Sequence, residues 1–294
     1  MTVELPASLA IGLIVFLGLA VGSFLNVCIY RLPRKLSIVR PGSHCGSCGR
    51  PLEWYENIPV LSYVALRGRC RTCKAWISWR YPIVELLTAA AFLAQYFAIG
   101  WSPLLPVRLL LTAALIILFA IDLEHQLLPN VITVPGIVVG FVASCFLAPG
   151  PMMSAAGIVL GGGVLWLLIE IWWRVRHVEA MGFGDVKMLA MIGAFLGAKL
   201  VFVTFVLSSF IGGIIAVGIV VSRRGNLATA LPFGTMLAVA ALAHEYRLVL
   251  VDEGGRVLPA RAGALVEELM KSDAARFVAD PKGFLESLAR DDQD

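Results

Sequence analysis

Long apolar runs recur along most of the chain, and they constrain its fold more than any other feature. A run of about 20 apolar residues is long enough to cross the hydrocarbon core of a bilayer as a helix. Hydrophobic residues make up 59% of the 294 residues, and charged residues only 15%. A soluble domain would carry about 25% charged residues. We therefore predict an all-α polytopic membrane protein.

The hydropathy pattern predicts about eight transmembrane helices. They cover roughly residues 7–29, 83–101, 104–121, 131–148, 154–173, 185–198, 200–221 and 227–244. Loop 31–82 holds ten Lys and Arg but only two acids, so the positive-inside rule places it in the cytoplasm. Alternation from this loop puts the N-terminus and the tail after Glu245 outside. The opening MTVEL lacks a basic n-region, so the first span is expected to stay uncleaved.

The cytoplasmic loop carries two C-x-x-C pairs, Cys45–Cys48 and Cys70–Cys73. Two such pairs can direct four thiolates at one tetrahedral Zn²⁺, so the loop is zinc-ribbon-like. Two disulfides or redox pairs are the alternative, which the reducing cytoplasm disfavours. The loop aromatics, among them Trp54, Trp76 and Trp79, either pack around the metal or rest on the membrane interface.

Other polar and thiol groups in the spans have simpler expected roles. Cys28 and Cys145 are expected to be small buried hydrophobes. Three acids, Glu85, Glu124 and Glu170, are expected to be hydrated at an interface, with Glu170 paired to Arg174 one turn away.

Two aspartates stand apart from these acids. Asp122 ends the third span in IDLEHQLLPN, and Asp185 starts the sixth in GFGDVKML. Both fall at the cytoplasmic membrane face under the predicted topology. If the two carboxyls meet, one keeps a proton, and the pair can run aspartic-protease chemistry. A plain helix N-cap is the alternative for Asp185.

The residues around Asp185 fit a site that a substrate approaches closely. Gly182 and Gly184 let backbone or substrate come near, because glycine has no side chain. Lys187 is expected to hold a carboxylate or to extend to the lipid head groups.

Five segments together resemble the type IV prepilin peptidases, bifunctional leader peptidases and N-methyltransferases among the GxGD intramembrane aspartyl proteases. They are GSFLNVCIYRLPR (22–34), CGSCGRPLEWYENIPVLSYVALRGRCRTCKAWISWRYPIVELLT (45–88), IDLEHQLLPN (121–130), GFGDVKML (182–189) and PFGTMLA (232–238). The resemblance implies that Asp122 and Asp185 are catalytic and that the four loop cysteines form the family's tetrad. The glycine-rich motif would be weak alone, but here it stands beside the second aspartate and the zinc loop.

The resemblance also implies an activity and its location. Prepilins and pilin-like proteins of pilus or type II secretion systems would be the substrates, at the cytoplasmic face of the bacterial inner membrane. The enzyme would remove their basic leader and methylate the new N-terminal amine with S-adenosylmethionine. Glu53 and Glu56 are then expected to orient that amine. No dinucleotide-binding fingerprint places the methyl donor.

The chain departs from the family pattern in three places. Asn130 stands where an acid is frequent, and activity is expected to survive. Thr235 replaces a common proline, which we expect to be minor. The tail is longer than expected, and we predict an ordered, weakly stable, dispensable appendage outside the cytoplasm.

The predicted organisation has four parts. They are a first transmembrane helix (1–30), the zinc loop associated with methyl transfer (31–82), the protease core (83–244) and the C-terminal extension (245–294). One alternative function is an intramembrane protease without methyltransferase activity. Another is a proton-coupled transporter with a structural zinc module, although no internal repeat supports it. Membrane lipid is an expected partner and nucleic acid is not; the oligomeric state stays open.

Overall fold

The computed structural model describes residues 7–177, 182–222 and 232–247, so residues 248–294 of the predicted C-terminal extension lie outside these ranges. Every regular element in these ranges is a helix, accompanied by two isolated β-bridges in the loop. The elements are α1 (Ala7–Arg31), η1 (Trp54–Asn57), α2 (Leu61–Ala65), α3 (Arg80–Ile99), α4 (Leu104–His125), α5 (Asn130–Ser144), α6 (Pro151–Arg176), α7 (Phe183–Leu196), α8 (Ala198–Val221) and α9 (Phe233–Arg247).

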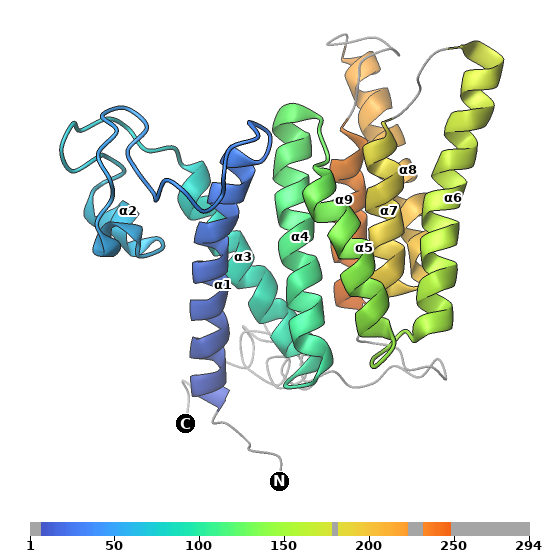
Figure 1. Ribbon diagram of the computed structural model, residues 1–294, viewed down its shortest axis with the longest axis horizontal. Coiled ribbons are helices and arrows are strands. Elements are labelled where there is room, and N and C mark those ends of the chain that lie inside the picture. Colours follow the sequence, from blue (N-terminus) through green and yellow to red (C-terminus); the bar gives the residue numbers. More distant parts are fainter. Residues whose placement is uncertain (1–6, 178–181, 223–231, 248–294) are drawn as a thin grey trace, which may run out of the picture.

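Eight of these helices stand roughly side by side as a bundle, while η1, α2 and the rest of the loop project beside α1 (Figure 1). Five helices, α1, α3, α4, α6 and α8, are long and apolar enough to cross a membrane. Two shorter apolar helices lie at 130–144 and 233–243. The chain is therefore an integral membrane protein.

Helix α7 lies inside the bundle between α5, α6, α8 and α9. Every residue from Met188 to Leu196 is buried, as expected for a helix that is apolar on all sides. It ends at Gly197, whose φ of +80° favours glycine, and α8 begins at the next residue. This glycine therefore marks the break between the predicted spans 185–198 and 200–221.

Small residues bring the helices close together. A Cβ at Gly157 would lie 2.3 Å from the carbonyl oxygen of Gly193, which joins α6 to α7 backbone to backbone. A Cβ at Gly18 would lie 2.5 Å from Cα of Ala89, which does the same for α1 and α3. Close backbone approach of this kind is typical of helices packed in a bilayer, where dispersion contacts drive association.

The chain direction brings several functional segments to one end of the bundle. The end of α1, the loop, the end of α4 and the starts of α5, α7 and α9 lie at the same end (Figure 1). An ion pair ties two of these segments, because Arg80 Nη1 at the start of α3 lies 2.8 Å from Glu124 Oε1 on α4. The cationic loop and both predicted aspartates therefore share one face of the molecule.

Candidate active site and metal centre

Asp122 lies in the last turn of α4 with its side chain turned into the bundle. It is buried, and its Oδ2 accepts two hydrogen bonds from one residue of α9. Thr235 donates its backbone N–H at 2.7 Å and its hydroxyl at 2.8 Å. Two donors on one oxygen favour negative charge there. Sequence analysis treated Thr235 as a minor departure, and the structure places it directly against Asp122.

Asp185 occupies the first turn of α7 and is also buried, at 9% exposure. The N-cap is Gly182, so the alternative that Asp185 is a plain N-cap is wrong. Its carboxyl interacts electrostatically with that of Asp122. The fold thus brings together two carboxyls that helices α5 and α6 separate along the sequence.

The two glycines of GFGD have different surroundings. A Cβ at Gly184 would lie 2.9 Å from Cβ of Leu128, which is too close for two carbons. Leu128 also packs on Gly234, where a Cβ would lie 3.0 Å from both Leu128 Cδ1 and Asp122 Oδ2. Around Gly182 the nearest atom is 3.9 Å away. Gly184 and Gly234 therefore serve close packing around the aspartates, and Gly182 leaves open space.

Lys187 reaches across from α7 to the start of α5. Its Nζ donates to Asn130 Oδ1 at 2.9 Å. This contact is with an amide, so the expectation that Lys187 holds a carboxylate or extends to head groups is not what the structure shows.

The four cysteines of the loop converge on one point. Their Sγ atoms all lie within 4.8 Å of one another, and those of Cys45 and Cys73 are 3.7 Å apart. A tetrahedron with Zn–S arms of about 2.3 Å has edges of about 3.8 Å. A disulfide requires about 2.0 Å, and the thiols are unlinked. The donor set therefore fits one tetrahedral Zn²⁺.

Both C-x-x-C pairs have the same backbone conformation. Cys45 N–H donates to Arg50 at 2.9 Å, and Cys70 N–H donates to Ala75 at 2.8 Å. The residue after each pair has positive φ and returns its N–H to the first cysteine. Backbone N–H groups of Cys73 and Thr72 point at Cys70 and lower its pKa to about 6, which prepares that thiol to bind a metal as thiolate.

The two loop acids have unequal surroundings. Glu56 is buried and pairs with Arg50 at 2.7 Å, while its Oε2 accepts the Glu53 N–H at 2.9 Å. The Arg50 guanidinium, followed by this N–H, lowers the pKa of Glu56. Its charge is thus satisfied within the loop. Glu53 is exposed and does not line the loop's cavity.

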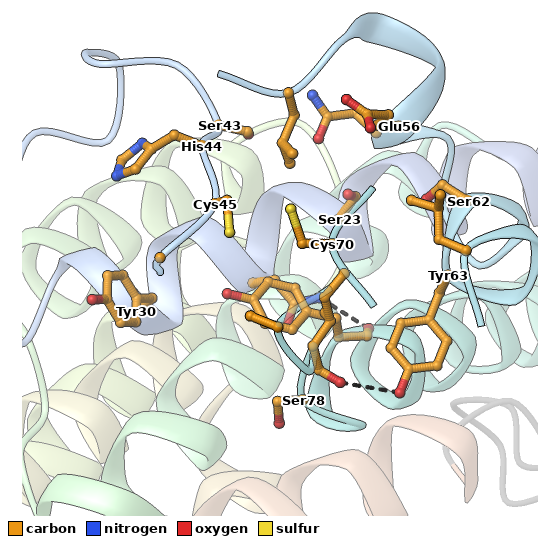
Figure 2. Close-up of a pocket in the computed structure, with 18 of the residues that line it drawn as sticks. Ser23, Tyr30, Ser43, His44, Cys45, Glu56, Ser62, Tyr63, Cys70 and Ser78 are labelled. Carbon is orange, nitrogen blue, oxygen red and sulfur yellow. Dashed lines mark hydrogen bonds between the residues drawn. The ribbon is translucent and has the colours of Figure 1, made fainter. Parts of the chain in front are cut away.

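A cavity of about 350 Å³ lies between the loop and the ends of α1 and α3. Cys45 and Cys70 point toward one another along one wall (Figure 2). Glu85 of α3 lines it, is 6% exposed, and accepts the Val60 N–H at 2.8 Å. The prediction that Glu85 is simply hydrated is therefore wrong, because its helix position is covered by the loop.

The remaining sequence predictions have mixed outcomes. Glu170 pairs with Arg174 at 2.8 Å, as predicted. Cys28 is buried, also as predicted, but Cys145, the residue directly after α5, is exposed. Trp54, Trp76 and Trp79 are 77%, 58% and 60% exposed, so packing around the metal does not bury them.

The fold and these sites define an all-helical integral membrane protein with a buried carboxyl pair and a cysteine tetrad at the same end. Comparisons with known proteins agree with this class. Residues 16–99 match the bacterial Peptidase A24 N-terminal domain, and residues 109–217 match the type IV leader peptidase family. The chain belongs to the type IV leader peptidase family.

Several curated relatives carry the name prepilin leader peptidase/N-methyltransferase. The one from Pseudomonas putida is 38% identical over 76% of this chain and 86% of the relative. The one from Neisseria gonorrhoeae is 36% identical over 79% and 88%. The one from Myxococcus xanthus is 44% identical over 68% and 60%. No solved structure matches the chain.

Proposed function

We propose that this protein removes the leader peptide of prepilins and pilin-like proteins and then N-methylates the new N-terminus. The observation that carries the cleavage step is the buried Asp122–Asp185 pair, supported by the relatives' shared name. Membership of a peptidase family favours this function over a proton-coupled transporter.

The surroundings of the two carboxyls support a different role for each. Asp122 receives both donors of Thr235, and we assign it as the base that takes a proton from the attacking water. Asp185 is buried beside that charge, so it keeps its proton and donates it toward the scissile amide. Water oxygen bonds to the carbonyl carbon, the C–N bond then breaks, and the leaving amine takes up a proton.

The second reaction belongs to the face that carries the cysteine loop. S-adenosylmethionine, when bound, supplies an electrophilic methyl group to the freed amine. Cys45, Cys48, Cys70 and Cys73 would hold Zn²⁺ as a closed structural site, since four thiolates leave no position for water.

The positive-inside rule supports placing both reactions on the cytoplasmic side of the bacterial inner membrane, with eight spans and an external tail. A cysteine at Ser287, introduced into a Cys145→Ser background because Cys145 is itself exposed, tests this topology. It should react in intact cells with a membrane-impermeant thiol reagent, whereas reaction only after permeabilisation contradicts the eight-span arrangement.

Purified protein mixed with a prepilin and labelled S-adenosylmethionine tests the activity. Mass spectrometry of the product should show the shortened, singly N-methylated chain. Asp122→Asn and Asp185→Asn should each lose cleavage by at least about 10²-fold, as expected for positioned acid–base groups. Glu170→Gln, which makes the same change outside the site, should cleave normally. Normal cleavage by either folded aspartate variant refutes the pair.

A further inference from the structure

We propose that the cavity between the cysteine loop and helices α1 and α3 binds S-adenosylmethionine. This inference rests on the methyltransferase half of the proposed function and gives that reaction a place. The cavity's volume of about 350 Å³ falls within the range of small-molecule sites, about 300–1,000 Å³.

An unpartnered acceptor inside the wall points to a ligand with donors. Asn26 of α1 is 1% exposed and lines the cavity. Its Nδ2 donates to the carbonyl oxygens of Tyr81 at 3.0 Å and Gly22 at 3.3 Å, which fixes the amide orientation. Its Oδ1 is buried and has no hydrogen-bond partner among the described residues. A buried acceptor of this kind costs about 1–3 kcal/mol unless a donor reaches it, and the amino and hydroxyl groups of S-adenosylmethionine are such donors.

Glu85 adds a carboxylate to the same wall. Val60 N–H donates to its Oε2 at 2.8 Å, and the Ser23 hydroxyl donates to the same carboxyl group. Val60 itself is held at φ 60°, ψ −49°, a conformation that a β-branched residue adopts only when its surroundings impose it. The loop therefore closes over Glu85 with local backbone strain at Val60.

The other walls carry aromatic rings together with two cationic side chains, Arg31 and Arg71. Tyr63, Trp76 and Tyr81 line the cavity from the loop and α3. Aromatic rings attract cationic groups and stack on heterocycles. S-adenosylmethionine combines a sulfonium, an ammonium, a carboxylate and an adenine, which match the acceptors, the arginines and the aromatic rings of this wall.

The cavity also adjoins the predicted metal centre. Cys45 and Cys70 line it, so a metal held by the tetrad forms part of its wall (Figure 2). The loop is tied to α1 as well, because Arg31 donates to the carbonyl oxygens of Ser37 at 2.9 Å and Gly42 at 3.2 Å. The cavity, the cysteine tetrad and the ends of α1 and α3 thus lie together at the same face as Asp122.

The test measures binding of S-adenosylmethionine to the full-length, metal-loaded protein by equilibrium dialysis, with no prepilin present. Glu85→Gln should weaken binding about 10- to 100-fold, as expected for loss of a charge-assisted contact. Ser62→Phe, which puts a ring into the cavity from α2, should abolish binding. Glu170→Gln makes the same carboxylate-to-amide change outside the cavity and should bind normally. Metal content and thermal unfolding report the folding of each variant.

Photo-crosslinking of labelled S-adenosylmethionine to wild-type protein gives a readout that needs no variant. Labelled peptides should come from the loop and from the end of α1. If the wild type binds and methylates while Glu85→Gln and Ser62→Phe bind equally well, or if the label maps to α5–α9, the cavity is not the site and the proposed function stands. If the wild type neither binds nor methylates, the methyltransferase half of the function fails together with the site.

Discussion

Substituting Gly184 tests whether close packing against Leu128 sets the position of Asp185. An added Cβ would lie 2.9 Å from Leu128 Cβ, whereas carbons in contact are about 3.5–4.0 Å apart. The start of α7 or the α4–α5 connection must then move by about 0.6–1.1 Å, the difference between these distances. Neither atom is the free end of a flexible side chain, so the backbone takes up the shift.

The consequence for Gly184→Ala follows from where the shift falls. Asp185 is the next residue, and a misplacement of about 1 Å can cost about 10²-fold in rate. Overpacking should also lower the free energy of unfolding by about 1–3 kcal/mol. We expect kcat for prepilin cleavage to fall about 10²-fold, measured by separation of cleaved and intact substrate over time.

Gly182→Ala is the matched control two residues earlier. Its nearest neighbour would be 3.9 Å away and its φ is −76°, so alanine fits without strain. Leu128→Gly in the Gly184→Ala background should restore much of the lost rate, because it removes the Cβ atom that the new methyl group would meet. Equal activity of the two glycine variants, or no rescue, would show that this contact does not set the carboxyl's position.

Three further substitutions test other parts of the site. Thr235→Val removes the hydroxyl donor to Asp122 but keeps the backbone N–H, so kcat should fall about tenfold with KM unchanged. Thr235→Ser keeps a hydroxyl and should retain the wild-type kcat. A normal kcat for the valine variant contradicts the assignment of Asp122 as the base. Asn130→Asp turns the hydrogen bond from Lys187 into an ion pair, so the free energy of unfolding should rise by no more than about 1 kcal/mol. Cleavage should be retained. A lower unfolding temperature contradicts the contact between these two side chains. Elemental analysis of the wild type should find about one zinc per chain. Cys45→Ser should lower this zinc content and make the loop sensitive to proteolysis. A protease-resistant loop without metal refutes the zinc site.

Local patterns in the sequence predicted much of this protein. The apolar runs predicted a helical membrane protein because span length alone distinguishes such segments. The helix boundaries agree with the predicted spans within a few residues. The exception is α9, which begins at Phe233, whereas the predicted span begins at residue 227. The two C-x-x-C pairs predicted the tetrad because each pair is a local turn whose geometry the spacing nearly dictates.

Only the tertiary structure decided which distant groups meet. Thr235 reaches Asp122 across 113 residues, and no periodicity within either helix encodes that contact. Signals for Asn26 and Glu85 were present, since a polar residue inside an apolar span is a candidate for function. The loop lies over α3, and for this reason Glu85 is buried rather than hydrated. Long-range packing of this kind depends on how whole surfaces fit together, and neighbouring residues in the chain do not determine it.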